Sequence, residues 1–415
     1  MSDVNDTFQK REQRIRDAVE LKVPDRVPIL LPLQFFPARQ FGIQTKVAYY
    51  NFSEWFSAYE KSVTSYKPDL YLGPTSGIFS SGRLLEMIGM KQIKWPGYNL
   101  PDDATFQFVE GEYMKAESYD DFLEDPSDFL LRQYLPEICS NLSGLRDLPD
   151  LKTIASGYAA VGALAFLAMP QIKTALDALS KAIDESAAWT FELMAFTQRL
   201  TEKGFPMHAG GATLVPYDLI SDMLRGMRGT MMDMYRCPDK LLAAQKKMLP
   251  FLIDMAINMC ALTGVNRAFI PLNRGSDGFM SLKQFETFYW PDLKKMMIAF
   301  IEAGITPIPF FEGNYDQRIE YLNELPKGKV LGLFDRTDLV RAKEIIGDIV
   351  CIAGGMPITM LQAGTPEEVR EHTKKMIDIL GKDGGYIMAV GCPMDDARPE
   401  LVDVWVEATR EYGKY

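Results

Sequence analysis

Short apolar runs alternate with longer stretches of helical periodicity along the second half of the chain. From about residue 205 onward, each apolar run ends in a polar or glycine-containing turn. This alternation predicts strands and helices in βαβα order, which is typical of a parallel sheet. We expect strands at residues 267–272, 306–311, 329–334, 349–353 and 386–390, and two earlier strands at 27–31 and 69–72.

The helix between the last two predicted strands is clearly delimited by its sequence. Thr365 suits the N-cap position, and Pro366 suits the first helical position. Glu367 and Glu368 favour the first turn, and Gly381 marks the end of the helix. The side chains expected to face inward are Val369, Thr373, Met376, Ile377 and Leu380.

Residues from roughly 90 to 200 follow a less regular pattern. They include an Ala- and Leu-rich helical run over 159–188, and we expect this part to cover the mouth of a barrel with extra helices. No Gly/Ser-rich or Pro-rich linker divides the chain. The sequence therefore predicts one α/β domain over residues 1–415, a (β/α)8 TIM barrel with a helical elaboration over roughly 90–200.

Composition and charge exclude several classes of partner. The formal net charge is −11, and no block of Lys and Arg stands apart from acidic neighbours, so nucleic acid is not expected as a partner. We see neither a signal peptide nor the roughly 18 uninterrupted apolar residues that a membrane span needs, and we expect a cytoplasmic protein. The five cysteines form no C-x-x-C pair and are expected to be reduced thiols.

Polar or flexible residues directly follow the predicted strands, where barrel enzymes hold their working side chains. The segments are NRGSD at 273–277, EGN at 312–314, DRTD at 335–338, GGM at 354–356 and CPMD at 392–395. We expect the catalytic residues among them.

Glu312 and Cys392 are the strongest candidates for binding a metal. A carboxylate and a thiolate over one barrel mouth can hold zinc and leave a position open for a substrate or an activated water. The alternative is structural, with Cys392 as a small buried apolar side chain and Glu312 as an ion-paired group. The sequence leaves both interpretations open.

Histidine is nearly absent, which excludes a metal site built from several imidazoles. His208 follows a plausible strand and precedes glycines, so it is a candidate ligand or proton carrier at the mouth; the alternative is a buried histidine with satisfied hydrogen bonds. His372 lies among charged residues and is expected at the surface. Asp335 is a candidate for proton transfer or for completing the metal shell.

Four residues are candidates for binding the substrate. Arg225 suits a carboxylate or phosphate, although an arginine that anchors a loop is the commoner case. Asn273, Tyr217 and Tyr289 are the others, and Tyr289 belongs to an aromatic cluster that either walls an apolar pocket or packs a helix against the barrel. No Walker loop, dinucleotide fingerprint, G-x-S-x-G elbow or H-E-x-x-H motif occurs, which leaves metal or corrinoid chemistry.

Several stretches of the chain resemble the uroporphyrinogen decarboxylase superfamily. They are the opening PDRVP at 24–28, the middle stretch VPYDLISDMLRGMRGTMMDMYRCPDKL, and the closing GGMPITMLQAGTPEEV and GGYIMAVGCPMDDARPELV. The similarity runs over most of the chain and is strong in these stretches. It implies the TIM barrel fold.

Two branches of this superfamily differ in their motifs. The true decarboxylases carry RQAGR after the first strand and a GHG turn at the last strand, where this chain reads LQFFPARQFG and VGCPMD, so tetrapyrrole decarboxylation is disfavoured. The methyltransferases carry a cysteine where Cys392 stands and an H-x-C-G-N element that aligns with residues 310–314. Phe310 and Glu312 replace the histidine and cysteine of that element, and Asn273 stands where one subgroup carries HRGSD.

The resemblance implies a corrinoid-dependent methyltransferase of the O-demethylase type. Such a protein takes the methyl group of a small methoxylated, aromatic or otherwise methylated donor and passes it to cobalamin on a corrinoid protein, with zinc as Lewis acid. Two alternatives stay open. One is a metal-free decarboxylase or lyase with paired carboxylates such as Glu312 and Asp335, and the other is a non-catalytic component of a methyl-transfer system.

Overall fold

The computed structural model describes residues 2–78, 80–150, 152 and 157–415. In this part of the chain, eight strands pair in parallel in the order β2-β1-β10-β9-β8-β7-β6-β5. A parallel bridge between Tyr71 and Met207, just ahead of β5, joins the two outer strands and closes the ring. The fold is therefore the predicted (β/α)8 barrel. Its strands are β1 (Ile29–Leu31), β2 (Leu70–Tyr71), β5 (Gly211–Ala212), β6 (Arg267–Pro271), β7 (Thr306–Phe311), β8 (Leu331–Phe334), β9 (Cys351–Met356) and β10 (Tyr386–Val390).

The seven predicted strands are confirmed, with small shifts at their ends. β7 and β10 occupy the predicted ranges, and the other five begin and end within three residues of them. The eighth strand, β5, lies in a glycine-rich segment that has no apolar run. A Cβ at Gly211 would come within 2.5 Å of the carbonyl oxygen of Ala256. Glycine is required there because the neighbouring helix packs closely on the strand.

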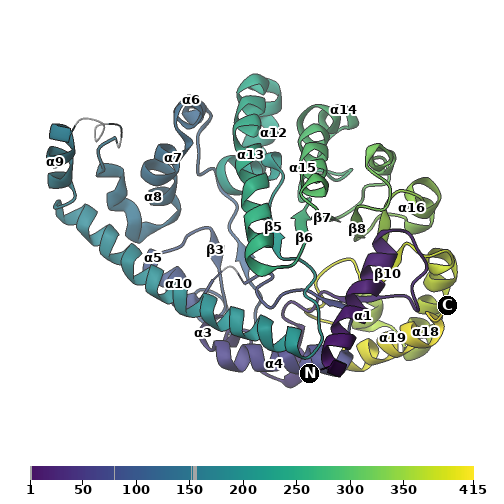
Figure 1. Cartoon of the computed structure of the whole chain (residues 1–415). Coiled ribbons are helices and arrows are strands. Elements are labelled where there is room, and N and C mark those ends of the chain that lie inside the picture. The colour runs from purple at the N-terminus through teal and green to yellow at the C-terminus, as the bar shows by residue number, and fades with distance from the viewer. Residues whose placement is uncertain (1, 79, 151, 153–156) are drawn as a thin grey trace.

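A helix accompanies each strand on the outside of the ring (Figure 1), and the outer strand faces pack against these helices in one extended apolar core. Thr365 caps α18 as predicted, and the Glu368 carboxylate accepts from the Thr365 N–H at 2.8 Å. The five side chains expected to face inward from this region are buried. The wall helices are α4 (Phe52–Tyr66), α10 (Pro170–Glu202), α13 (Pro238–Thr263), α15 (Trp290–Glu302), the 3-10 helix η7 (Ile319–Glu324), α16 (Leu339–Ile346), α18 (Pro366–Met376) and α19 (Pro399–Tyr412).

Helix α1 (Ser2–Val19) closes the N-terminal end of the barrel. Arg14 on this helix donates to Asp69 at 2.6 Å, directly before β2. Ile15, Ala18 and Val19 join the apolar cluster that fills the inside of the ring. The opening of the barrel therefore lies at the C-terminal ends of the strands.

The loops on the C-terminal side carry the remaining elements. After β1 come α2 (Phe36–Phe41) and α3 (Val47–Tyr50); after β2 come α5 (Gly82–Ile88), β3 (Ile93–Lys94), β4 (Gln107–Phe108), η1 (Ala116–Ser118), α6 (Tyr119–Glu124), α7 (Pro126–Phe129), η2 (Leu130–Tyr134), α8 (Leu135–Ile138), η3 (Ser140–Asp147) and α9 (Gly157–Phe166). After β5 come α11 (Pro216–Asp218), η5 (Leu219–Arg225) and α12 (Gly226–Arg236); after β6 come α14 (Leu282–Gln284) and η6 (Phe285–Tyr289); after β9 comes α17 (Ile358–Ala363), and η8 (Ile377–Gly381) continues α18.

Residues 90–200 take two different positions. Phe196 on α10 contacts Phe56 and Tyr59 of α4 and Tyr71 of β2, so the second half of α10 belongs to the barrel wall. The shorter elements lie on the mouth side, where Glu110 approaches Arg274 at 3.8 Å. Within the described residues, no helix combines the length and apolarity needed to cross a membrane.

Candidate active site

The C-terminal ends of the strands bring charged side chains together at the mouth of the barrel. Asn273 and Arg274 follow β6, Glu312 follows β7, Asp335 follows β8 and Cys392 follows β10. Because the strands are parallel, these ends meet at one edge of the ring. Three of the predicted residues are neighbours, since Asp335 bonds to Gly313, next to Glu312, and lies against Gly391, next to Cys392.

Glu312 has the least restrained carboxylate of this group. Within the described part of the chain, its side chain takes part in no hydrogen bond or ion pair. The side chain is exposed at the rim, and its partial desolvation, together with the Asp335 and Asp222 carboxylates, raises its pKa, while Arg274 opposes them. A carboxyl group with a raised pKa and no fixed partner can donate a proton to a ligand.

Two phenylalanines form an apolar surface inside the barrel, close to the chain segment that carries Glu312. Phe310 precedes Glu312 by two residues, and the Glu312 N–H donates to the Phe310 carbonyl oxygen at 3.0 Å. Phe269 on β6 stacks on Phe310 with 6.0 Å between ring centroids and 21° between ring planes. Both rings pack on the cluster inside the barrel, yet both are partly exposed. Because α1 closes the other end, their exposed area faces the mouth.

Asp218 lies beside the mouth and organises the loop after β6. It is fully buried and accepts from the Tyr289 hydroxyl at 2.6 Å, the Asn273 N–H at 3.0 Å and the Arg274 N–H at 3.1 Å. Burial raises the pKa of Asp218, and the nearby Asp222 carboxylate adds to this rise. These contacts fix the backbone that carries Asn273 and Arg274.

Asp222 holds the side chains of the same two residues. Its carboxylate accepts from Asn273 Nδ2 at 2.6 Å and from Arg274 Nε at 2.8 Å. Burial raises its pKa, while Arg274 and Asn273 oppose that rise. Asn273, predicted to bind substrate, is thus oriented by Asp222 at the rim of the mouth.

The two tyrosines predicted to bind substrate are enclosed by protein. Tyr289 is 0% exposed and Tyr217 is 2% exposed. Their rings pack edge to face with 6.0 Å between centroids, and burial raises the pKa of both hydroxyls. The Tyr289 hydroxyl positions the Asp218 carboxylate through its hydrogen bond, whereas the Tyr217 hydroxyl contacts the Met234 sulfur at 3.7 Å.

The side chains after β8 and β10 complete the rim. Asp335 accepts from the Gly313 N–H at 3.1 Å, and burial raises the pKa of Asp335. Burial, together with Asp335, raises the pKa of the half-buried Cys392 thiol to about 12. Asp395 accepts from the Phe35 N–H at 2.8 Å, and burial raises its pKa to about 6. Asp338 instead caps α16 through the N–H groups of the first turn.

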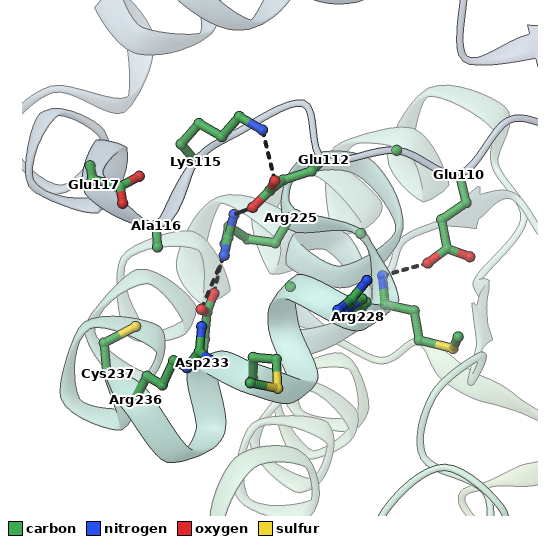
Figure 2. A pocket seen from close by; sticks show the side chains of 15 residues that line it. Glu110, Glu112, Lys115, Ala116, Glu117, Arg225, Arg228, Asp233, Arg236 and Cys237 are labelled. Atoms are coloured by element: carbon green, nitrogen blue, oxygen red, sulfur yellow. Dashed lines mark hydrogen bonds and ion pairs between the residues drawn. The ribbon is translucent and has the colours of Figure 1, made fainter.

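Arg225 lines a pocket of about 740 Å³ beside the mouth (Figure 2). Its guanidinium contacts both oxygens of Asp233, at 2.6 and 3.1 Å, and donates to Glu112 at 2.5 Å and to the Met114 carbonyl at 2.6 Å. Arg225 and Asp233 are 3% and 2% exposed. These partners occupy the guanidinium, which corresponds to the loop-anchoring interpretation rather than to an anion-binding one.

His208 lies in the barrel wall and not at the mouth. Its backbone N–H donates to the Tyr71 carbonyl at 2.9 Å. Its imidazole packs edge to face on Phe269, with 5.4 Å between the ring centroids. Phe269 precedes Asn273 by four residues, so in extended chain their Cα atoms lie roughly 13 Å apart. Burial lowers the pKa of His208 to about 3, and neither ring nitrogen has a partner. His208 therefore lies in the barrel wall, behind the ring of Phe269.

Gly354 and Gly355, in the GGM segment that was expected near the catalytic residues, lie close to other parts of the chain. Both have positive φ angles, +140° and +101°. A Cβ at Gly355 would come within 2.6 Å of the Tyr386 hydroxyl, and one at Gly354 within 2.8 Å of the Phe334 carbonyl oxygen. These glycines allow β9 to pack against the neighbouring strands.

Comparison with known proteins decides the family. A family model described as "Uroporphyrinogen decarboxylase (URO-D)" matches residues 168–412, more than half of the chain. The chain belongs to the uroporphyrinogen decarboxylase (URO-D) family. Uroporphyrinogen decarboxylases of Psychromonas ingrahamii and Pseudoalteromonas translucida are 28% and 26% identical over 138 and 140 residues. These matches span 32% and 33% of this chain but only 38% and 39% of those proteins, which is well below half of their length.

The URO-D fold of this chain extends beyond the matched region. A solved structure titled "methyltransferase from Methanosarcina mazei" superimposes with a TM-score of 0.63 over 97% of this chain and 98% of that one. The sequence identity is 15%. At this identity the likeness establishes the shared fold over the whole chain.

The side chains of this URO-D member do not suit a complete zinc centre. A catalytic zinc takes three protein ligands, and no group of three or more His, Cys, Asp or Glu in the described residues is placed to hold a metal ion. Phe310 stands where the resemblance implies a histidine ligand, and Asn273 is bonded to Asp222. Glu312 and Cys392 supply only two ligands, one fewer than a catalytic zinc takes.

Sequence reasoning missed two residues of this URO-D site, Asp218 and Asp222. A signal was present, because two aspartates four residues apart share one face of a helix. They lie in the loop after β5, whose strand was not delimited by the sequence. Because β5 was not recognised, the sequence did not show that the two aspartates after it lie at the mouth.

Proposed function

We propose that this protein is a methyltransferase that demethylates a small methoxylated aromatic compound bound at the barrel mouth. The observation that carries the proposal is Glu312, an unpaired carboxyl group of raised pKa two residues after Phe310, whose ring stacks on Phe269. The rings offer a flat apolar surface for an aromatic substrate. The carboxyl group acts on a polar atom of a substrate bound at that surface. The full-length structural neighbour, titled a methyltransferase, supports this branch of the family.

In the proposed reaction, Glu312 protonates the ether oxygen as the bond between that oxygen and the methyl carbon breaks. The electron pair of this bond stays on the oxygen, so the demethylated product leaves as a neutral phenol. The methyl group leaves as a cation equivalent and needs a nucleophile. A reduced corrinoid, carried as a second substrate by a partner protein, supplies that electron pair.

The surrounding residues position the acid and the substrate. Partial desolvation and the nearby Asp335 and Asp222 carboxylates favour the protonated form of Glu312, since a negative charge nearby disfavours a second one. Arg274, held by Asp222 at 2.8 Å, orients polar groups of the substrate. A proton from Glu312 serves the role that a Lewis-acid metal serves elsewhere, so no step of this mechanism depends on zinc.

The test combines purified protein, methoxylated benzoates and cob(I)alamin, with formation of the methylated corrinoid followed by visible absorbance. We expect methyl transfer by wild-type protein, with or without a chelator, and loss of transfer in Glu312→Gln. No transfer from any methoxylated or N-methylated donor overturns the proposal. Stoichiometric zinc that is lost in Cys392→Ala, together with activity lost on chelation, restores the zinc mechanism implied by the resemblance.

A second candidate is decarboxylation or elimination without metal. The curated relatives in this URO-D family are decarboxylases, and the buried Asp218–Asp222 pair holds two carboxyl groups of raised pKa, as acid-base pairs do. Release of carbon dioxide from the same benzoates, independent of corrinoid, distinguishes this reaction from methyl transfer. A protein that gives neither product corresponds to a non-catalytic component.

A further inference from the structure

Four arginines lie at the N-terminal end of the barrel, opposite the mouth. Arg11 and Arg14 are one turn apart on α1, Arg26 precedes β1, and Arg410 lies in the last turn of α19. Arg14 and Arg26 donate to the same oxygen of the buried Asp69, at 2.6 and 2.8 Å. Arg26 belongs to the PDRVP segment, so one of the stretches that resemble the family contributes to this cluster and not to the mouth.

Arg11 is buried without a counter-ion. It is 9% exposed, and in the part of the chain that the structure describes its guanidinium takes part in no ion pair. It donates to the Gly204 carbonyl at 2.6 Å and lies 4.3 Å from the centroid of the Phe205 ring, while its Nε has no hydrogen-bond partner. Glu12, the next residue, is held by Arg267 at 2.7 and 2.9 Å. Buried charges are normally paired, so the chain leaves the charge of Arg11 uncompensated.

Arg410 also has only neutral acceptors. It is half-buried and donates to two backbone carbonyls at the C-terminal end of α4. A backbone bridge between Arg26 and Lys414 brings the end of α19 against Arg26. Burial lowers the pKa of Arg11 and of Arg410, and the charge of Arg26 adds to both shifts while Asp69 opposes them. Among the described residues, Arg11 and Arg410 are therefore cations without a carboxylate partner.

The carboxylates near these arginines are either engaged or exposed. Asp69 is fully buried, and its second oxygen accepts from a backbone N–H at 3.0 Å. Asp25 accepts from Arg14 with both oxygens, at 2.5 and 2.6 Å. Glu407 precedes Arg410 by one turn, but it is exposed and forms no ion pair with it in the described residues. Four arginines thus face two engaged carboxylates, and this excess of positive charge favours an anionic ligand.

We propose that Arg11, Arg26 and Arg410 bind a phosphate group. A guanidinium pairs with phosphate oxygens through two parallel hydrogen bonds, which makes arginine well suited to this ligand. Because Arg11 is enclosed, the group that reaches it must be small, which favours a single phosphate over an acidic peptide or a lipid surface. The end of a barrel opposite the mouth serves stability, so the expected effect is on folding. The proposal is independent of the proposed function.

The experiment is thermal unfolding of the full-length protein, followed by circular dichroism, in phosphate and in chloride buffers of equal pH and ionic strength. A ligand that binds only the folded state raises Tm, and we expect a rise of about 3 °C for the wild type in phosphate. Arg11→Met keeps an apolar stem over Phe205 and removes the uncompensated charge. We expect its Tm in chloride to match or exceed that of the wild type, and its rise in phosphate to be lost. Arg410→Gln also loses the rise, and the control Arg341→Gln, an exposed change on α16, keeps it.

Three results overturn the proposal. The first is an equal Tm of the wild type in both buffers. The others are a rise in phosphate that persists in Arg11→Met or in Arg410→Gln, which is a general effect of the salt, and a rise that is lost in Arg341→Gln as well. A rise confined to the wild type and Arg341→Gln supports the proposal. Glycerol phosphate in place of inorganic phosphate then identifies the source: a larger rise assigns the site to a phosphate ester, and an equal or smaller rise assigns it to inorganic phosphate.

Discussion

Among the carboxylates at the mouth, Glu312 differs from its neighbours by having no donor. Asp218 accepts three hydrogen bonds, Asp222 accepts two, and Asp335 accepts from the Gly313 N–H. Donors directed at a carboxylate favour its ionised form. A carboxyl group without donors remains free to give up a proton and take it back, which is why we assign the acid role to Glu312.

Replacement of Glu312 tests this assignment at the level of one side chain. Glu312→Gln removes the proton donor while keeping the shape, so we expect kcat to fall about 100-fold or more. In the wild type, kcat falls as pH rises through the raised Glu312 pKa, because the ionised form cannot donate. This alkaline limb disappears in the variant. The control Glu344→Gln changes an exposed side chain on α16 and leaves the pH dependence of kcat unaltered. A fall in kcat at high pH that persists in Glu312→Gln contradicts the assignment.

The buried Asp218 predicts a pH dependence of stability. Its folded pKa lies above the unfolded value of 3.8, so the folded state binds the proton more tightly. Its contribution is complete below pH 3.8 and is lost as pH rises toward the folded pKa, by at most about 1.4 kcal/mol per pH unit. Urea unfolding from pH 5 to 8 measures the slope, and Asp218→Asn flattens it. Equal slopes in both proteins show that Asp218 is ionised throughout.

At the residue scale, the sequence identified the side chains that directly follow apolar strands. Glu312, Asp335 and Cys392 each come after a run of Val, Ile, Leu, Phe, Met or Ala, so their place at the mouth followed from the barrel. The sequence left the position of His208 open because it does not show where β5 begins and ends. Strand pairing with Tyr71 puts it within the wall.

At the element scale, periodicity located the strands that are buried on both faces. Thr306–Phe311 and Tyr386–Val390 stood out as apolar runs between polar turns. β5 did not, because close packing against α13 selects glycine instead of β-branched residues. The run over 159–188 merged two helices, which separate before Pro170, the first residue of α10.

Arg225 holds α12 against the loop that carries Glu112. We therefore expect the replacement of Arg225 to cost much more stability than the replacement of Arg228. Arg225→Ala leaves the Asp233 carboxylate buried without its ion pair, which costs about 3 kcal/mol. Arg228→Ala, three residues along the chain and exposed, changes stability by about 0.5 kcal/mol or less. Urea unfolding compares the two variants. Equal, small effects mean that Arg225 is free to bind an anion in solution.

At the scale of the whole molecule, the order of strands determines which residues meet. Asn273, Glu312, Asp335 and Cys392 are spread over 120 residues of sequence, and the parallel ring brings their strand ends to one edge. The sequence predicted this convergence through the fold. It did not predict the Asp218–Asp222 support, which depends on how the loop after β5 folds back.

Isotope tracing tests the central claim, methyl transfer at the barrel mouth, most directly. Wild-type protein is incubated with cob(I)alamin and a methoxybenzoate that carries ¹³C in both its O-methyl and its carboxyl group, and the products are followed by NMR. Our account predicts that the methyl label moves to the corrinoid while the carboxyl label stays on the phenolic product. Appearance of the carboxyl label as bicarbonate, with the O-methyl group retained, contradicts it and assigns decarboxylation to this protein.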